Sequence, residues 1–204
     1  MRQVPRLKQP EIPVTLTYPL PSATTPAMRS LLHLGCLFVF FTIQATAAEG
    51  LKTFKVGEFS FASPAAWEWV EVTSPMRKAQ LKVPGKDGKS ADVIFFYFGE
   101  SGGGGTKANV DRWLGQFAEP REKINAKVEE TKVNNRTVTY VQADGTYKSG
   151  VPGGPTTPLP NTMLLGAILE SEQGNVFIRM TGPMELVKDS ANDFKKMVNG
   201  ALGK

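Results

Sequence analysis

Histidine and cysteine, the two residue types that most often carry catalysis or bind transition metals, each occur once in this 204-residue chain. They are His33 and Cys36, and both lie in an apolar segment near the N-terminus. If that segment is removed, the protein has no thiolate, no disulfide and no imidazole for a serine triad or a zinc site. The chemistry that remains is that of carboxylates, of Ser-Lys pairs and of oxygen-bound calcium or magnesium, and we expect no cofactor.

The apolar segment, residues 28–48, has the three parts of a signal peptide. Arg29 supplies the charged start, an apolar run extends from Leu31 to Phe41, and the small residues Ala47 and Ala48 mark the cleavage site. The apolar run is too short to cross a bilayer as a helix, which takes about 20 residues. We therefore expect a secreted or periplasmic protein with no stable membrane span after cleavage.

The same segment divides the chain. We interpret residues 1–27, which are rich in Pro and Thr, as an upstream leader ahead of the true start of translation, and residues 49–204 as one domain. A lipid anchor on Cys36 is the alternative to a free exported protein. The strongly apolar residues 37–41 argue against it, because they follow the cysteine that would begin the mature lipoprotein.

The charge of the predicted domain excludes one class of partner. The chain has 24 Lys and Arg and 19 Asp and Glu, but four of these basic residues and one acidic residue precede Glu49. The domain therefore has 20 basic and 18 acidic residues, and they are scattered along the sequence. A nucleic-acid interface needs concentrated positive charge, so we expect no nucleic-acid binding. The partner we expect is an unidentified protein or small ligand.

A run of four glycines stands between a predicted strand and a predicted helix: Gly102, Gly103, Gly104 and Gly105. Backbone N–H groups at such a place can bind an anion. The P-loop pattern is not met, because Thr106 precedes Lys107 where a P-loop has Lys before Ser or Thr. We therefore interpret the run as a flexible loop, with anion binding as the alternative.

Four pairs of side chains remain as candidates for catalysis. They are Ser101 with Lys107, Lys148 with Ser149, Glu129 with Glu130, and Glu119 with Glu122. A lysine acts as a base only when it is desolvated, and both Ser-Lys pairs flank glycine-rich segments that we expect to be wet. A hydrolase or transferase using Asp/Glu or Ser-Lys chemistry is thus the alternative to a binding, assembly or structural module of the bacterial envelope.

Hydrophobic periodicity predicts an α+β fold. Strands are predicted at residues 59–62, 67–72, 78–83, 91–98, 128–133, 137–147, 163–169 and 176–180. Apolar residues spaced as on one helical face predict a helix that includes Val110 and ends near Pro120, and a second helix that starts at Pro183. This order of elements predicts an antiparallel sheet of about seven strands packed between helices.

The core of this predicted sheet has two expected features. Residues 91–98 are apolar on both faces, so we expect a central strand with Phe95 and Phe96 both buried. We also expect the three tryptophans of the chain, Trp67, Trp69 and Trp113, to lie in the core rather than on a binding surface.

The domain opens with the pattern Phe59-x-Phe61-x-x-Pro64-x-x-Trp67 and closes with a helix, after a further helix in mid-chain. With these features the chain resembles the PsbP-like α/β/α sandwich of extrinsic photosystem subunits and many exported bacterial proteins of uncharacterised function. The resemblance covers about residues 51–202. It implies a binding, assembly or structural role without catalysis, and it assigns no metal or ligand residue.

Residues 149–161 are rich in glycine and proline, and we expect a long loop there between two strands. Hairpin connections usually take about 2 to 5 residues, and longer ones tend to be functional or disordered. Prolines pre-order a chain and so lower the entropy lost on binding. We therefore interpret the loop as an edge that contacts a partner, with a mobile surface excursion as the alternative. Its candidate contact residues are Val151, Pro152, Pro155, Pro158 and Pro160.

Overall fold

The structure is a computed structural model, and it describes residues 51–100, 102–150 and 154–203. The predicted signal peptide with Ala47 and Ala48, the alternative anchor Cys36, and three further candidates, Ser101, Val151 and Pro152, lie outside the described residues. Within the described ranges, no helix combines the length and apolar character needed to cross a membrane.

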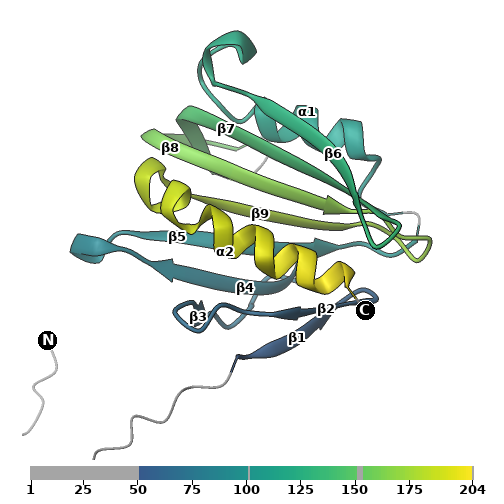
Figure 1. The fold of residues 1–204 in the computed structure, drawn as a ribbon. Helices are drawn as coiled ribbons and strands as arrows, with labels where there is room; N and C mark the ends of the chain where they lie inside the picture. Colours follow the sequence, from purple (N-terminus) through teal and green to yellow (C-terminus); the bar gives the residue numbers. More distant parts are fainter. Residues whose placement is uncertain (1–50, 101, 151–153, 204) are drawn as a thin grey trace, which may run out of the picture. The chain divides into compact units, whose positions relative to one another are not determined.

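Seven strands form one antiparallel sheet in the order β3-β4-β5-β9-β8-β7-β6 (Figure 1). The strands are β3 (Glu68–Trp69), β4 (Arg77–Pro84), β5 (Ser90–Tyr97), β6 (Lys127–Val133), β7 (Arg136–Gly150), β8 (Thr156–Leu169) and β9 (Val176–Pro183). The pairing of β5 with β9 joins the first half of the domain to the second. The sheet and its two helices confirm the predicted α+β fold with about seven strands between helices.

One face of the sheet is covered by helix α2 (Met184–Leu202) and by a hairpin of β1 (Thr53–Val56) and β2 (Phe59–Ala62). The predicted helical stripe is buried there, including Val187, Phe194 and Val198. Phe61 of the hairpin packs edge-on against Phe95 of β5, with ring centroids 5.1 Å apart. The sequence did not predict β1, because a strand of four residues with only two apolar side chains, Phe54 and Val56, is too short to stand out by its alternation.

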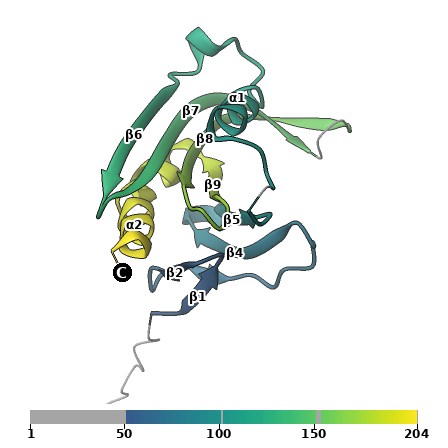
Figure 2. The same cartoon turned by 90° about the vertical axis from the view of Figure 1, so that its right-hand side faces the viewer.

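The opposite face is only partly covered. Helix α1 (Thr106–Leu114) buries Val110, Trp113 and Leu114 against β7, β8 and β9. Figures 1 and 2 place α1 and α2 on opposite sides of the sheet. Trp113 lies directly on the backbone of Gly166, where an added Cβ atom would come within 2.3 Å of the indole ring. The helix ends at Leu114 rather than near Pro120, so α1 is nine residues long and leaves part of this face open.

This incomplete cover corrects two expectations about the core. Phe95 faces α2 and is 0% exposed, but Phe96 faces the other way and is only partly buried, so the expectation that both are buried is wrong for Phe96. Trp67 and Trp113 are buried as expected, whereas Trp69 is half-buried. Trp69 is less covered because it lies on β3, a two-residue strand at the edge of the sheet.

The long loop expected at residues 149–161 is wrong. β7 continues to Gly150 and β8 begins at Thr156, and Ser149 pairs with Thr157. Residues 147–150 and 154–161 therefore form a projecting two-stranded segment, named the ribbon here (Figure 2). Two of its three described prolines, Pro158 and Pro160, lie within β8, and Pro155 directly precedes that strand.

Proline is tolerated in the ribbon because one side of β8 is open there. β9 pairs with β8 only from Thr162 onward, so the outer edge of the ribbon has no neighbouring strand in the described structure. A proline on such an edge removes no hydrogen bond from the sheet. Sequence reasoning treats prolines as strand breakers, and it therefore mistook an edge strand for a loop.

Candidate functional site

A pocket of about 660 Å³ lies beside α1, over the part of the sheet that the helix leaves open. Its walls are mainly apolar, formed by Phe96, Phe98, Trp113, Phe177 and the exposed Met76. Three arginines, Arg77, Arg112 and Arg179, also line it, and no Asp or Glu does so among the described residues. An apolar pocket with a few converging polar groups is the usual form of a small-ligand site.

The register of the sheet determines which side chains form one wall of the pocket. Phe96 of β5 pairs with Phe177 of β9, and Arg179 follows Phe177 by two residues on the same face. Phe98, just past the end of β5, lies with its ring centroid 6.4 Å from that of Phe96 and 6.3 Å from that of Phe177. Three aromatic rings and one guanidinium therefore share one wall.

The glycine loop forms another wall, and it is packed rather than free. Gly103 and Gly104 have φ values of 81° and 76°, a backbone region that suits glycine. A Cβ atom on Gly103 would lie 2.6 Å from the ring of Phe177. The buried Asn109 side chain donates hydrogen bonds to the carbonyl oxygens of Gly103 and Gly105, at 2.8 and 3.0 Å. The contacts place this loop at the pocket, where its role as an anion-binding loop stays a prediction.

The three pocket arginines are each held by a neutral amide oxygen. The bonds run from Arg77 Nη1 to Gln80 Oε1 (2.7 Å), from Arg179 Nη1 to Gln116 Oε1 (2.8 Å), and from Arg112 Nη2 to Asn109 Oδ1. In the described part of the chain, none of the three has a carboxylate within ion-pair distance. The two other arginines described, Arg121 and Arg136, do form ion pairs, with Asp111 and Glu58. The pocket arginines are thus positioned without being neutralised by direct ion pairs.

Arg179 is the most enclosed of the three. Its Nε atom is buried and has no hydrogen-bond partner among the described residues. Burial lowers the pKa of Arg179, and the positive charges of Arg77 and Arg112 act in the same direction. Tyr147, whose ring centroid is 6.0 Å from the guanidinium carbon, and Asp92 act in the opposite direction. Gln80 donates a hydrogen bond from its Nε2 atom to the Asp92 carboxylate (3.3 Å) and accepts one from Arg77 at its Oε1 atom. In these hydrogen bonds, Asp92 is therefore linked to Arg77 through the amide of Gln80.

The structure separates most of the side chains proposed for catalysis. Lys148 and Ser149 are successive residues of β7, so their side chains leave opposite faces of the strand. Glu129 and Glu130 are likewise successive on β6, and both are exposed. Lys107 forms an ion pair with Asp111 on α1.

The Glu119 carboxylate is already engaged. It accepts hydrogen bonds from the backbone N–H of Thr146, at 2.9 and 3.1 Å from its two oxygens. Hydrogen bonds from the Thr146 side chain and backbone lower the pKa of Glu119, and Glu122 is exposed. No group of three or more His, Cys, Asp or Glu side chains suited to a metal ion is found in the described ranges.

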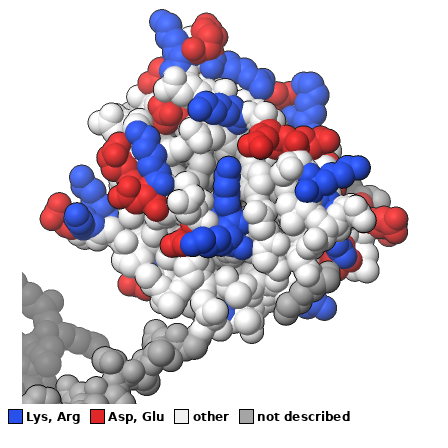
Figure 3. All heavy atoms as spheres, viewed as in Figure 1, with Lys and Arg blue, Asp and Glu red and all other residues white. Residues whose placement is uncertain are grey.

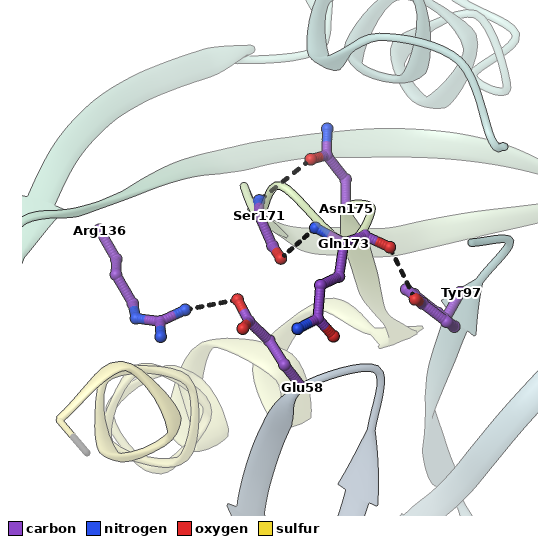
Figure 4. A network of polar contacts seen from close by, with 6 residues as sticks. All are labelled: Glu58, Tyr97, Arg136, Ser171, Gln173 and Asn175. Atoms are coloured by element: carbon purple, nitrogen blue, oxygen red, sulfur yellow. Dashed lines mark hydrogen bonds and ion pairs between the residues drawn. The ribbon is translucent and has the colours of Figure 1, made fainter. Parts of the chain in front are cut away.

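A second polar cluster lies where the turns at one end of the sheet meet (Figure 4). Arg136 Nη1 is 2.6 Å from Glu58 Oε1, and Tyr97 Oη donates to the backbone oxygen of Gln173 at 2.7 Å. Hydrogen bonds from Ser171 and then Arg136 lower the pKa of Glu58. These contacts tie the β1–β2 turn to β7 and the β8–β9 turn to β5, so we interpret this cluster as structural.

The surface charges agree with the scattered pattern in the sequence. On the face shown in Figure 3, basic and acidic side chains are interspersed. The pocket arginines were not predicted from the sequence, because Arg77, Arg112 and Arg179 lie far apart along the chain. One signal was present, since Arg179 interrupts the otherwise apolar strand segment of residues 176–180.

Comparison with known proteins bears on the fold alone. No family model and no curated protein sequence matches the chain. The structure is similar to cyanobacterial PsbP (CyanoP) from Synechocystis sp. PCC 6803, with 10% identity, a TM-score of 0.48, and coverage of 76% of this chain and 92% of that chain. It is also similar to the protein of unknown function PA94 from Pseudomonas aeruginosa, with 11% identity, a TM-score of 0.42, and coverage of 76% and 98%. A PsbP structure is thus among the structural neighbours of this chain.

Proposed function

We propose that the chain is an exported binding module that takes a small ligand into the pocket beside α1. The observation that carries this proposal is the set of three arginines around an apolar pocket, each held by an amide and none paired directly with a carboxylate among the described residues. Arg77 and Arg112 are exposed, but the Nε atom of Arg179 is buried without a hydrogen-bond partner among the described residues. Leaving such a group unpaired is costly, so it is uncommon where a charged side chain serves stability alone. Preorganised donors beside the exposed Phe98 and the partly exposed Phe96 instead suit a ligand.

A pocket-filling variant tests this proposal. Ser74 lines the pocket and is only partly buried, so Ser74→Trp places an indole in the space a ligand would use. Lys132→Trp adds the same group at an exposed position of β6 outside the pocket lining and is the matched control.

Each protein is incubated with a small-molecule extract of its native cells, washed and examined by native mass spectrometry. We expect wild type and Lys132→Trp to retain an added mass that Ser74→Trp does not. A wild type with no bound mass, or a mass that Ser74→Trp retains, would contradict the proposed function.

Export is the second part of the proposal, and residues 28–48 support it through their charged, apolar and small-residue parts. N-terminal sequencing of the protein recovered from its native cells tests this part. We expect the chain to begin at Ala48 or Glu49. Retention of residues 31–41 in the recovered protein would refute cleavage.

A further inference from the structure

We propose that the ligand of this pocket is an amphipathic carboxylate, whose carboxylate meets the arginines and whose apolar body lies on the aromatic wall. This inference rests on the proposed function and narrows it to one chemical class. It excludes cationic and neutral ligands of the same size.

The sign of the ligand charge follows from the charges around the pocket. Three guanidinium groups line it, and among the described residues no acidic side chain does. Asp92 is near enough to act on the pKa of Arg179, but its carboxylate accepts a hydrogen bond from Gln80 and is not within ion-pair distance of a pocket arginine. A cation entering the pocket would meet like charges, whereas an anion would meet opposite charges in a partly desolvated place, where electrostatic interactions are stronger.

The shape of the ligand's charged group follows from the N–H donors that the arginines present. A guanidinium has five N–H donors in a planar fork that matches the two oxygens of a carboxylate. In the described structure Arg179 donates one hydrogen bond, to Gln116, and Arg112 donates one, to Asn109. Both therefore keep donors for a ligand. The amides fix the direction of each side chain beforehand, which reduces the entropy lost on binding.

The apolar part of the ligand follows from the aromatic wall of the pocket. Phe98 is 41% exposed and Met76 is 59% exposed, and both line the pocket beside Phe96 and Phe177. Large apolar side chains that are exposed together mark an interaction site more often than single ones do. An acyl chain or an aromatic ring placed there would remove these side chains from water. A bare inorganic anion would leave this wall uncovered.

Isothermal titration calorimetry with defined probes tests the inference on the domain of residues 49–204. Dodecanoate below its micellar concentration supplies a carboxylate with an acyl body, and 1-naphthoate supplies one with an aromatic body. Dodecyltrimethylammonium has the same chain with the opposite charge, and acetate has the charge without the body. We expect at least one of the two amphipathic carboxylates to bind at least tenfold more tightly than dodecyltrimethylammonium and acetate. The comparison of dodecanoate with 1-naphthoate shows whether the apolar part of the ligand is an acyl chain or an aromatic ring.

Variants of the arginines complete the test. Arg179→Gln should weaken binding of the preferred carboxylate at least tenfold, while Lys132→Gln, which removes an exposed charge outside the pocket lining, should change it less than twofold. If Arg179→Gln does not fold, the double variant of Arg77→Gln and Arg112→Gln provides the same comparison, since both side chains lie on residues that are exposed.

Equal affinity for dodecanoate and dodecyltrimethylammonium, or unchanged affinity in the arginine variants, would overturn the inference. The outcome is separable from that of the proposed function. A ligand mass that Ser74→Trp abolishes, combined with charge-independent binding of the probes, would leave the pocket as a binding site and remove only its preference for carboxylates.

Discussion

Replacing Gly166 with alanine should destabilise the protein through one identified contact. An ideal Cβ atom at this position would lie 2.3 Å from Cζ3 and 2.7 Å from Cε3 of Trp113. Carbon atoms pack at about 3.5 Å or more, so the indole must move by roughly 1.2 Å. Trp113 is 4% exposed and is enclosed by the core beneath α1, which leaves it little space to move.

The magnitude follows from two opposing effects. Overpacking a core costs about 1–3 kcal/mol, whereas removing a glycine from a strand interior regains about 0.5–1 kcal/mol. We therefore expect Gly166→Ala to lower the free energy of unfolding by about 1–2 kcal/mol, which corresponds to a fall in Tm of roughly 2–8 °C for a domain of this size. Urea unfolding followed by far-UV circular dichroism measures the first quantity, and thermal unfolding measures the second.

Two controls isolate the cause. Trp113→Leu removes the ring atoms that clash, so Gly166→Ala should become neutral or stabilising in that background. Gly200→Ala makes the same chemical change at an exposed position of α2 where a Cβ atom meets nothing within 4 Å, and it should stabilise the protein by up to about 1 kcal/mol. If Gly166→Ala is as stable as wild type, or equally harmful with and without Trp113, the contact between this helix and the sheet is not the one described.

Three further predictions concern the core, the polar cluster and the ribbon. Phe95→Ala should lower the free energy of unfolding by about 3–5 kcal/mol, and Phe96→Ala should lower it clearly less because its side chain is partly exposed. Equal losses in urea unfolding would contradict the finding that α1 covers only part of its face of the sheet. Because hydrogen bonds lower the pKa of Glu58 in the folded protein, its contribution to stability is present above the ordinary glutamate pKa of about 4.3 and is lost as the pH falls through the lower folded value. The unfolding midpoints of wild type and Glu58→Gln should therefore differ at pH 7 and converge at low pH, and a pH-independent difference would rule this out. Replacing residues 149–157 with an Asn-Gly turn should leave thermal stability unchanged, since the buried base of the ribbon is kept, and a large fall in Tm would show that the tip supports the fold.

Much of the fold is predictable because local periodicity and burial agree in most elements. The two-sided apolar pattern of residues 91–98 predicted a central strand, and the stripe that includes Val187 and Phe194 predicted the closing helix. The failures occur where burial is incomplete. β1 was missed because its alternating pattern is only four residues long, and Phe96 was expected to be buried because its own sequence does not reveal how short α1 is.

The candidate site could not be predicted from local sequence patterns, for a different reason. Its arginines come from three elements whose neighbourhood is set by the pairing of β4 with β5 and of β5 with β9, and by the position of α1. In the sequence, Arg77 and Arg112 look like ordinary surface residues, and only Arg179 stands out, because it lies within an apolar strand segment. Only the fold shows that their immediate hydrogen-bond partners are amides, and this is the property on which the proposed site depends.

The prolines of the ribbon have a consequence for how the protein meets other copies of itself. An uncovered strand edge is a template onto which another chain can add, and natural proteins blunt such edges to avoid aggregation. Pro158 and Pro160 both lie in the part of β8 that no strand covers among the described residues, and neither has an N–H to donate. A strand that added to this part of β8 would lack hydrogen-bond donors at these two positions. The projecting ribbon can therefore present its side chains to the surroundings while resisting fibril-like growth along its backbone.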